Sequence, residues 1–164
     1  MPQALQCIVA CTDSSGRYAV VRDFATEQAR ESGARVILYD ISQRSEMTDA
    51  RPNFWAGEGE AELYDRPLEP VAIEKLGYHD LAVQVQEARA AGADAYGWLP
   101  NEPGGKGLAA YAEREDADVV LMPAGEQDTG KYIDEWHRAE RRDVVHPRAK
   151  VRLVDSEKHL VPLT

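Results

Sequence analysis

Short apolar runs recur along the chain, and most of them follow an alanine and a polar residue at the end of a helix-like stretch. They are CIVAC at 7–11, VILYDI at 36–41, AYGWL at 95–99, VVLMP at 119–123 and VRLV at 151–154. Short continuous apolar runs, in place of alternating ones, are typical of strands covered on both faces. Strands that alternate with helices predict a parallel sheet with right-handed crossovers.

The stretches between these runs carry apolar residues at helical spacing. They predict helices at 17–32, 78–91, 106–115 and 130–141. Gly33 and Gly92 follow the first two helices at the position that commonly ends a helix. Candidate N-caps are Ser14 or Ser15 for the first helix and Asp128 or Thr129 for the last.

The stretch at 42–77 interrupts this alternation. It contains Pro52, Pro67 and Pro70, several acidic residues, and the aromatic pair Phe54 and Trp55. Loops longer than about 15 residues are usually functional or disordered. A lid over the sheet and a dimer contact would both use the aromatic pair, and a packed hairpin or short helix without a functional role is an equal alternative. We therefore expect one domain over 1–164 with a long connection at 42–77.

Charge and hydropathy exclude several classes of partner. The 164 residues carry 29 acidic and 19 basic side chains, a formal charge of −10, which argues against a protein that wraps duplex nucleic acid. Basic residues gather near the C-terminus and are interpreted as a solvated rim: Arg138, Arg141, Arg142, Arg148, Lys150 and Arg152. No signal sequence and no run of ~20 apolar residues is visible, so we expect a cytoplasmic protein with no membrane partner.

The two cysteines are predicted to be buried thiols. Cys7 and Cys11 lie four residues apart in a strand pattern, which places them on the same side of the strand roughly 13 Å apart. A disulfide needs Cα atoms within about 7 Å, so these two residues cannot pair with each other. The four histidines show no ligand spacing with them, and we expect no metal site.

Ligands of open parallel sheets bind at the carboxyl ends of the strands, where the strand order reverses. The groups expected there are Thr12, Asp13, Ser14 and Ser15, the residues 39–42 beginning with Tyr39, and the turn at 123–130. Asp13 is placed to accept from an adenine amino group, and Ser14 and Ser15 to meet a phosphate. Helix capping is the alternative role for these residues.

No catalytic motif stands out in the sequence. It contains no GxxxxGK[ST] loop, and the glycine-rich 101–107 segment, NEPGGKG, lacks the Ser or Thr after lysine. A flexible connection between strand and helix explains that segment better than a phosphate loop. A Ser–His–Asp elbow and an acid pair within a known motif are also missing. We therefore expect a protein that is not an enzyme.

The chain resembles the universal stress protein family over nearly its whole length. The resemblance rests on IVACTDSS at 8–15, GARVILY at 33–39, DADVVLM at 116–122 and the segment 145–154. It implies a five-stranded sheet in the order 3-2-1-4-5 with helices on both faces, the adenine nucleotide alpha hydrolase-like fold. It also implies a homodimer through the last strand and, in one branch, ATP or AMP in the crevice between strands 1 and 4.

The glycine motif of the nucleotide-binding branch is not matched. Pro123 and Glu126 stand where the branch has two glycines, a third glycine would fall at Glu135 or Trp136, and Ser14 replaces another. Gly125 and Gly130 remain and are expected to shape a different turn. Proline supplies no N–H, and acidic residues bring like charge toward a polyphosphate. We therefore expect no ATP held through its triphosphate.

Three hypotheses follow from the sequence. The first is a non-enzymatic, dimeric stress-response or regulatory protein that requires no cofactor and acts by binding or interaction. The second is a sensor of AMP or another small molecule that uses Asp13, Ser14, Ser15, Tyr39, Gly125 and Gly130. The third is an enzyme of the wider nucleotide-binding α/β group with unrecognised chemistry.

Overall fold

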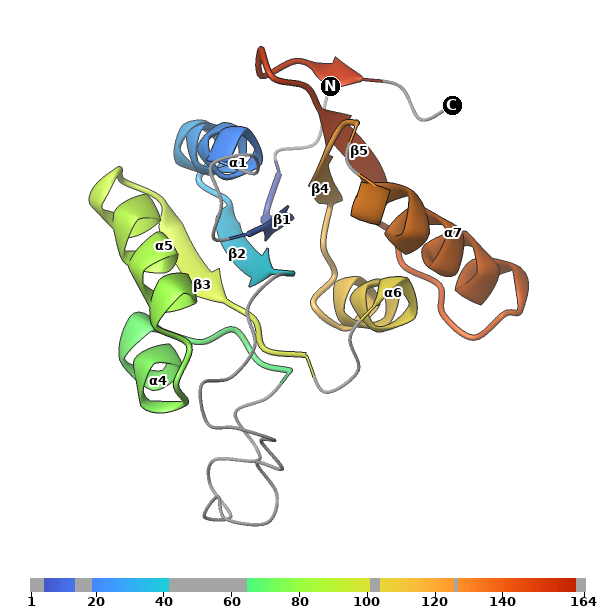
Figure 1. The fold of residues 1–164 in the computed structure, drawn as a ribbon, viewed down its shortest axis with the longest axis horizontal. Helices are drawn as coiled ribbons and strands as arrows, with labels where there is room; N and C mark the ends of the chain where they lie inside the picture. The colour runs from blue at the N-terminus through green and yellow to red at the C-terminus, as the bar shows by residue number, and fades with distance from the viewer. Residues whose placement is uncertain (1–4, 14–18, 42–64, 101–103, 126, 162–164) are drawn as a thin grey trace.

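Six strands form one sheet in the order β3-β2-β1-β4-β5-β6 (Figure 1). The computed structural model describes residues 5–13, 19–41, 65–100, 104–125 and 127–161. The strands are β1 (Cys7–Thr12), β2 (Arg35–Asp40), β3 (Asp94–Gly97), β4 (Val119–Pro123), β5 (Lys150–Val154) and β6 (Leu160–Val161). The first five are parallel, and β6 runs antiparallel to β5. The predicted fold class and five-strand order are confirmed, and the sixth strand corrects the predicted number.

Helices cover both faces of the sheet. They are α1 (Ala19–Ser32), α4 (Pro70–Lys75), α5 (His79–Ala90), α6 (Gly105–Arg114) and α7 (Gln127–Arg141). Figure 1 shows α1, α4 and α5 on one side and α6 and α7 on the other. Along β1, Ile8 and Ala10 pack with the first group, whereas Val9 and Cys11 pack with the second. The strands are therefore apolar on both faces, as their continuous apolar runs predict.

Two helix ends follow the prediction, and one helix start does not. Gly33 follows α1 with φ of 78°, and Gly92 follows the last residue and the C-cap of α5 with φ of 101°. This left-handed conformation suits glycine and ends both helices. The start predicted for the last helix is wrong, because α7 begins at Gln127. Asp128 and Thr129 therefore lie inside its first turn and not at its cap.

Part of the 42–77 connection is ordered structure. Its described residues, 65–77, include α4 and an antiparallel bridge between Leu68 and Gly97 of β3. Leu68 and Ile73 belong to the core beneath α5. This part of the connection thus contains a short helix, and the role of the connection stays a prediction. The aromatic pair Phe54 and Trp55 lies outside the described residues.

A hairpin adds β6 to the outer edge of β5. The carboxylate of Asp155 accepts hydrogen bonds from the amides of Glu157 and His159, both at 2.9 Å, and so shapes the turn. β6 then pairs with Leu153 and Val154 of β5. The homodimer through the last strand stays a prediction, and β6 takes up the carboxyl half of the β5 edge. Among the described residues, no helix is long and apolar enough to cross a membrane.

Candidate functional site

A buried chain of polar side chains lies where β1 and β2 end. Thr12 is fully buried, and its hydroxyl donates a 2.7 Å hydrogen bond to Gln84 Oε1 on α5. Gln84 Nε2 donates a 2.9 Å bond to Asp40 Oδ2. Thr12 and Asp40 are paired in register, so both side chains point to the α5 face of the sheet. Polar groups of this kind are costly to bury unless they are hydrogen-bonded, and each of these three is.

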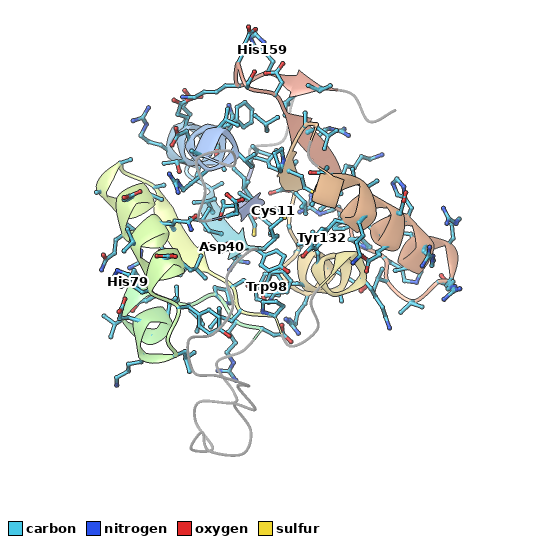
Figure 2. All side chains as sticks on the ribbon, viewed as in Figure 1. Cys11, Asp40, His79, Trp98, Tyr132 and His159 are labelled. Atoms are coloured by element: carbon cyan, nitrogen blue, oxygen red, sulfur yellow. The ribbon has the colours of Figure 1, made fainter. Side chains whose placement is uncertain are left out.

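Asp13 lies directly beyond this chain. It follows the last residue of β1 and is only 6% exposed, while Asp40 on the neighbouring strand is 4% exposed. The amide of Ile41 donates a 2.9 Å bond to the Thr12 carbonyl, which holds the two strand ends together. The two adjacent strands thus bring two nearly buried carboxylates to the carboxyl edge of the sheet. Figure 2 places Asp40 between the two groups of helices.

An aromatic cluster lies on the other face of the sheet, toward α6 and α7. The hydroxyls of Tyr39 on β2 and Tyr132 on α7 lie 2.8 Å apart. Tyr39 also packs on Trp98, with ring centroids 4.7 Å apart, and Trp98 stacks on Tyr111 at 4.1 Å. Burial, and then the hydrogen bond to Tyr132, raise the pKa of Tyr39, so it remains a neutral phenol. Trp98 and Tyr132 lie near the centre of Figure 2, close to Cys11.

Hydrogen-bonding groups of the turn between β4 and α7 are bonded within the protein. Pro123 has no N–H, and the amide of Ala124 donates a 2.8 Å hydrogen bond to the Val154 carbonyl of β5. The buried hydroxyl of Thr129 donates a 2.8 Å bond to the Pro123 carbonyl. Gly125 is exposed with φ of 82°. Gly130, predicted to shape this turn, lies within α7 instead.

The structure places two of the sequence-predicted site residues at the same edge of the sheet. Asp13 and Tyr39 both lie at the carboxyl edge of the sheet, whereas Ser14 and Ser15 lie outside the described residues. Gln84 was not predicted as a site residue. Its position in the sequence could have indicated its burial, because helical spacing places it on one stripe with the buried residues Leu81, Val85 and Ala88. A polar residue on such a stripe indicates a buried partner.

Neither cysteine of β1 is a ready nucleophile. Both are buried and unpaired with each other, as predicted. Burial raises the pKa of the Cys7 thiol to about 11, and burial also raises the pKa of the Cys11 thiol. Because the thiolate is the reactive form, both groups are inert at neutral pH. The polar groups at the strand ends are suited to holding a ligand by hydrogen bonds.

The sequence matches no family model and no curated protein. Solved universal stress proteins are similar to it in fold. A universal stress protein in complex with cAMP is 20% identical, with a TM-score of 0.53 over 91% of this chain and 97% of that one. The Archaeoglobus fulgidus universal stress protein in complex with dAMP is 15% identical, with a TM-score of 0.50 over 90% and 96%. A universal stress protein family member from Burkholderia pseudomallei is 14% identical, with a TM-score of 0.51 over 92% and 98%.

Proposed function

We propose that this chain is a non-enzymatic regulatory protein that binds an adenosine-like small molecule at the carboxyl edge of β1 and β2. The observation that carries the proposal is the pair of nearly buried carboxylates, Asp13 and Asp40. A carboxylate accepts several hydrogen bonds, so these two can accept from a ligand rich in donors in addition to their contacts within the protein, such as that of Asp40 with Gln84. The similar folds in complex with cAMP and dAMP support a ligand that contains adenine.

The same two carboxylates set a limit on the ligand's charge. Two like unit charges 4 Å apart repel by about 4 kcal/mol at an effective dielectric near 20. That is about half of the binding free energy of a micromolar ligand, roughly 8 kcal/mol. The turn after β4 offers little compensation, since Pro123 and Ala124 have no amide left for an anion. The expected order of affinity is therefore adenosine, then AMP, then ATP.

The absence of turnover is part of the proposal. Tyr39 and the two thiols stay protonated at neutral pH, because burial raises the pKa of each. Among the described residues we find no nucleophile next to a general base, the pair that hydrolysis through a covalent intermediate uses. Incubation with AMP or ATP should therefore return the nucleotide unchanged, as chromatography would show. Release of phosphate at a rate proportional to protein concentration would overturn this part of the proposal.

A calorimetric titration with adenosine tests the binding site. We expect Asp13→Asn and Asp40→Asn each to weaken binding by roughly tenfold or more, since each removes an acceptor from a buried polar site. Asp23→Asn is the matched control, because Asp23 is an exposed aspartate of α1 outside the site. Equal affinity in all four proteins would contradict the proposed site.

A further inference from the structure

A hollow lies on the α6 and α7 side of the sheet, away from the strand ends. Its volume is about 200 Å³, and its lining comes from the start of α6, the last half of α7 and the residues that follow. The lining residues are Lys106, Glu135, Arg138, Ala139, Arg142 and Val144. Figure 1 shows α6 and α7 side by side. Three basic side chains therefore share one small hollow in a chain of net charge −10.

The two arginines of this hollow differ from Arg35 and Arg148 in their ion pairs. Arg35 lies 3.1 Å from a carboxylate oxygen of Glu115, and Arg148 lies 2.7 Å from one of Asp118. Within the described part of the chain, Arg138 and Arg142 make no ion pair. They stand four residues apart on α7, so they lie on one face of the helix. Their charges are therefore directed at the hollow without a carboxylate partner.

The single acid of the hollow is held at its edge. An oxygen of Glu135 lies 2.8 Å from the place that a Cβ on Gly104 would occupy, at the start of α6. The amino end of a helix carries partial positive charge, which stabilises a carboxylate there. Three cations and one anion leave the lining with a net charge of about +2. A dianion is the species that this charge matches.

Two apolar residues, Ala139 and Val144, also line the hollow. After α7 the chain turns at Asp143, which has φ of 62°, and the amide of Val144 donates to the Ala139 carbonyl at 3.1 Å. This helix-ending geometry folds Val144 back over the last turn of α7. Ala139 is buried and Val144 is 53% exposed. The hollow thus joins a basic wall to an apolar surface that suits a small carbon skeleton.

We propose that this hollow binds a small phosphate monoester, with the phosphate between Lys106, Arg138 and Arg142 and the organic part on Ala139 and Val144. Guanidinium groups bind phosphate oxygens through charge-assisted hydrogen bonds, often two at a time. A phosphate monoester carries a charge of about −1.5 to −2 at neutral pH, close to the charge of the lining. This site is separate from the adenosine site proposed at the strand ends and adds a second ligand to the proposed function.

Calorimetry with glycerol 3-phosphate at low ionic strength tests the site. We expect the wild-type chain to bind it, and Arg138→Gln and Arg142→Gln each to weaken binding by roughly tenfold. Arg141→Gln is the matched control, because Arg141 is an exposed arginine of the same helix turn that does not line the hollow. It changes the net charge by the same amount and should alter affinity by less than about twofold. Unchanged circular dichroism in all variants would show that the fold is retained.

Three results would overturn the proposal. They are no binding of glycerol 3-phosphate, an equal loss in the Arg141→Gln control, and equal binding of uncharged glycerol. The two sites can also be separated. Asp13→Asn should weaken adenosine binding and leave glycerol 3-phosphate binding unchanged, and Arg138→Gln should do the reverse. Failure of one proposal therefore leaves the other open to its own test.

Discussion

The hydroxyl of Thr129 donates a 2.8 Å hydrogen bond to the carbonyl of Pro123, so a side chain of α7 closes the turn that leads into this helix. The next amide of the turn, that of Ala124, is bound to β5. The groups that a parallel sheet commonly offers to a phosphate at this place are therefore partly used within the protein. This turn supports a ligand held by Asp13 and Asp40 over one held by its phosphates.

Removal of the Thr129 hydroxyl should destabilise the fold. Thr129→Val keeps the shape of the side chain and leaves the buried Pro123 carbonyl without its partner. We expect a loss of about 1–3 kcal/mol in the free energy of unfolding, measured by urea denaturation. Thr129→Ser keeps the hydroxyl and should lose less. A valine variant as stable as the wild type would show that this bond contributes nothing.

The Tyr39 and Tyr132 hydroxyls should stabilise the protein as a pair. Each single change to phenylalanine leaves the other hydroxyl without its 2.8 Å partner. We expect Tyr39→Phe and Tyr132→Phe to cost about 0.5–1.5 kcal/mol each, and the double variant to cost less than their sum. Denaturation of the four proteins gives the coupling free energy directly. Strict additivity would mean that the two hydroxyls act independently.

Asp118 should make the fold sensitive to acid. Burial opposes its charge, but the amides of Gln6 and Cys7, at 2.6 and 2.9 Å, and Arg148 outweigh that effect. The pKa of Asp118 in the folded state is therefore lower than its ordinary value of 3.8. A lowered pKa stabilises the fold above pH 3.8, and this contribution disappears as the pH falls through the folded value.

Urea denaturation of Asp118→Asn as a function of pH checks this prediction. The variant should be less stable than the wild type at pH 7, and the difference should shrink below about pH 4 because the wild type loses its own contribution there. Asp134→Asn, on the exposed face of α7, is the control and should follow the wild type. A difference that stays constant with pH would show that the ionised carboxylate is not what stabilises the fold.

Asp143→Gly should stabilise the protein. Asp143 has φ of 62° where α7 ends, a conformation that glycine adopts without strain. The 3.0 Å contact of Asp143 with His146 is exposed, so its loss costs little. We expect a gain of about 0.5–1 kcal/mol in the free energy of unfolding, with Asp143→Ala less stable than the wild type. A glycine variant less stable than the wild type would contradict this reading of the helix end.

The central sheet is predictable because its strands are covered on both faces. The apolar run 119–123 gives β4 with the same bounds, and Gly33 and Gly92 mark the helix ends. β6 is not predictable in this way. It has two residues, Leu160 is 53% exposed, and its position depends on Asp155 accepting two backbone amides. A hydropathy pattern carries no signal for such a turn.

The site is only partly predictable, for a related reason. Asp13 follows a strand at the reversal of strand order, so its place at the carboxyl edge can be inferred from topology. The link from Thr12 through Gln84 to Asp40 joins residues up to 72 positions apart. Only the packing of α5 on the sheet brings them together. Likewise, only the placement of α7 shows that, among the described residues, Arg148 of the basic rim makes ion pairs and Arg138 and Arg142 do not.

Displacement of radiolabelled adenosine from the wild-type chain tests the central claim most directly, since it reports on the proposed adenosine site alone. The two carboxylates, Asp13 and Asp40, should favour the uncharged ligand. We predict that unlabelled adenosine displaces the label at the lowest concentration, that AMP requires more, and that ATP requires at least about tenfold more than adenosine. ATP that displaces the label at a lower concentration than adenosine would contradict the account.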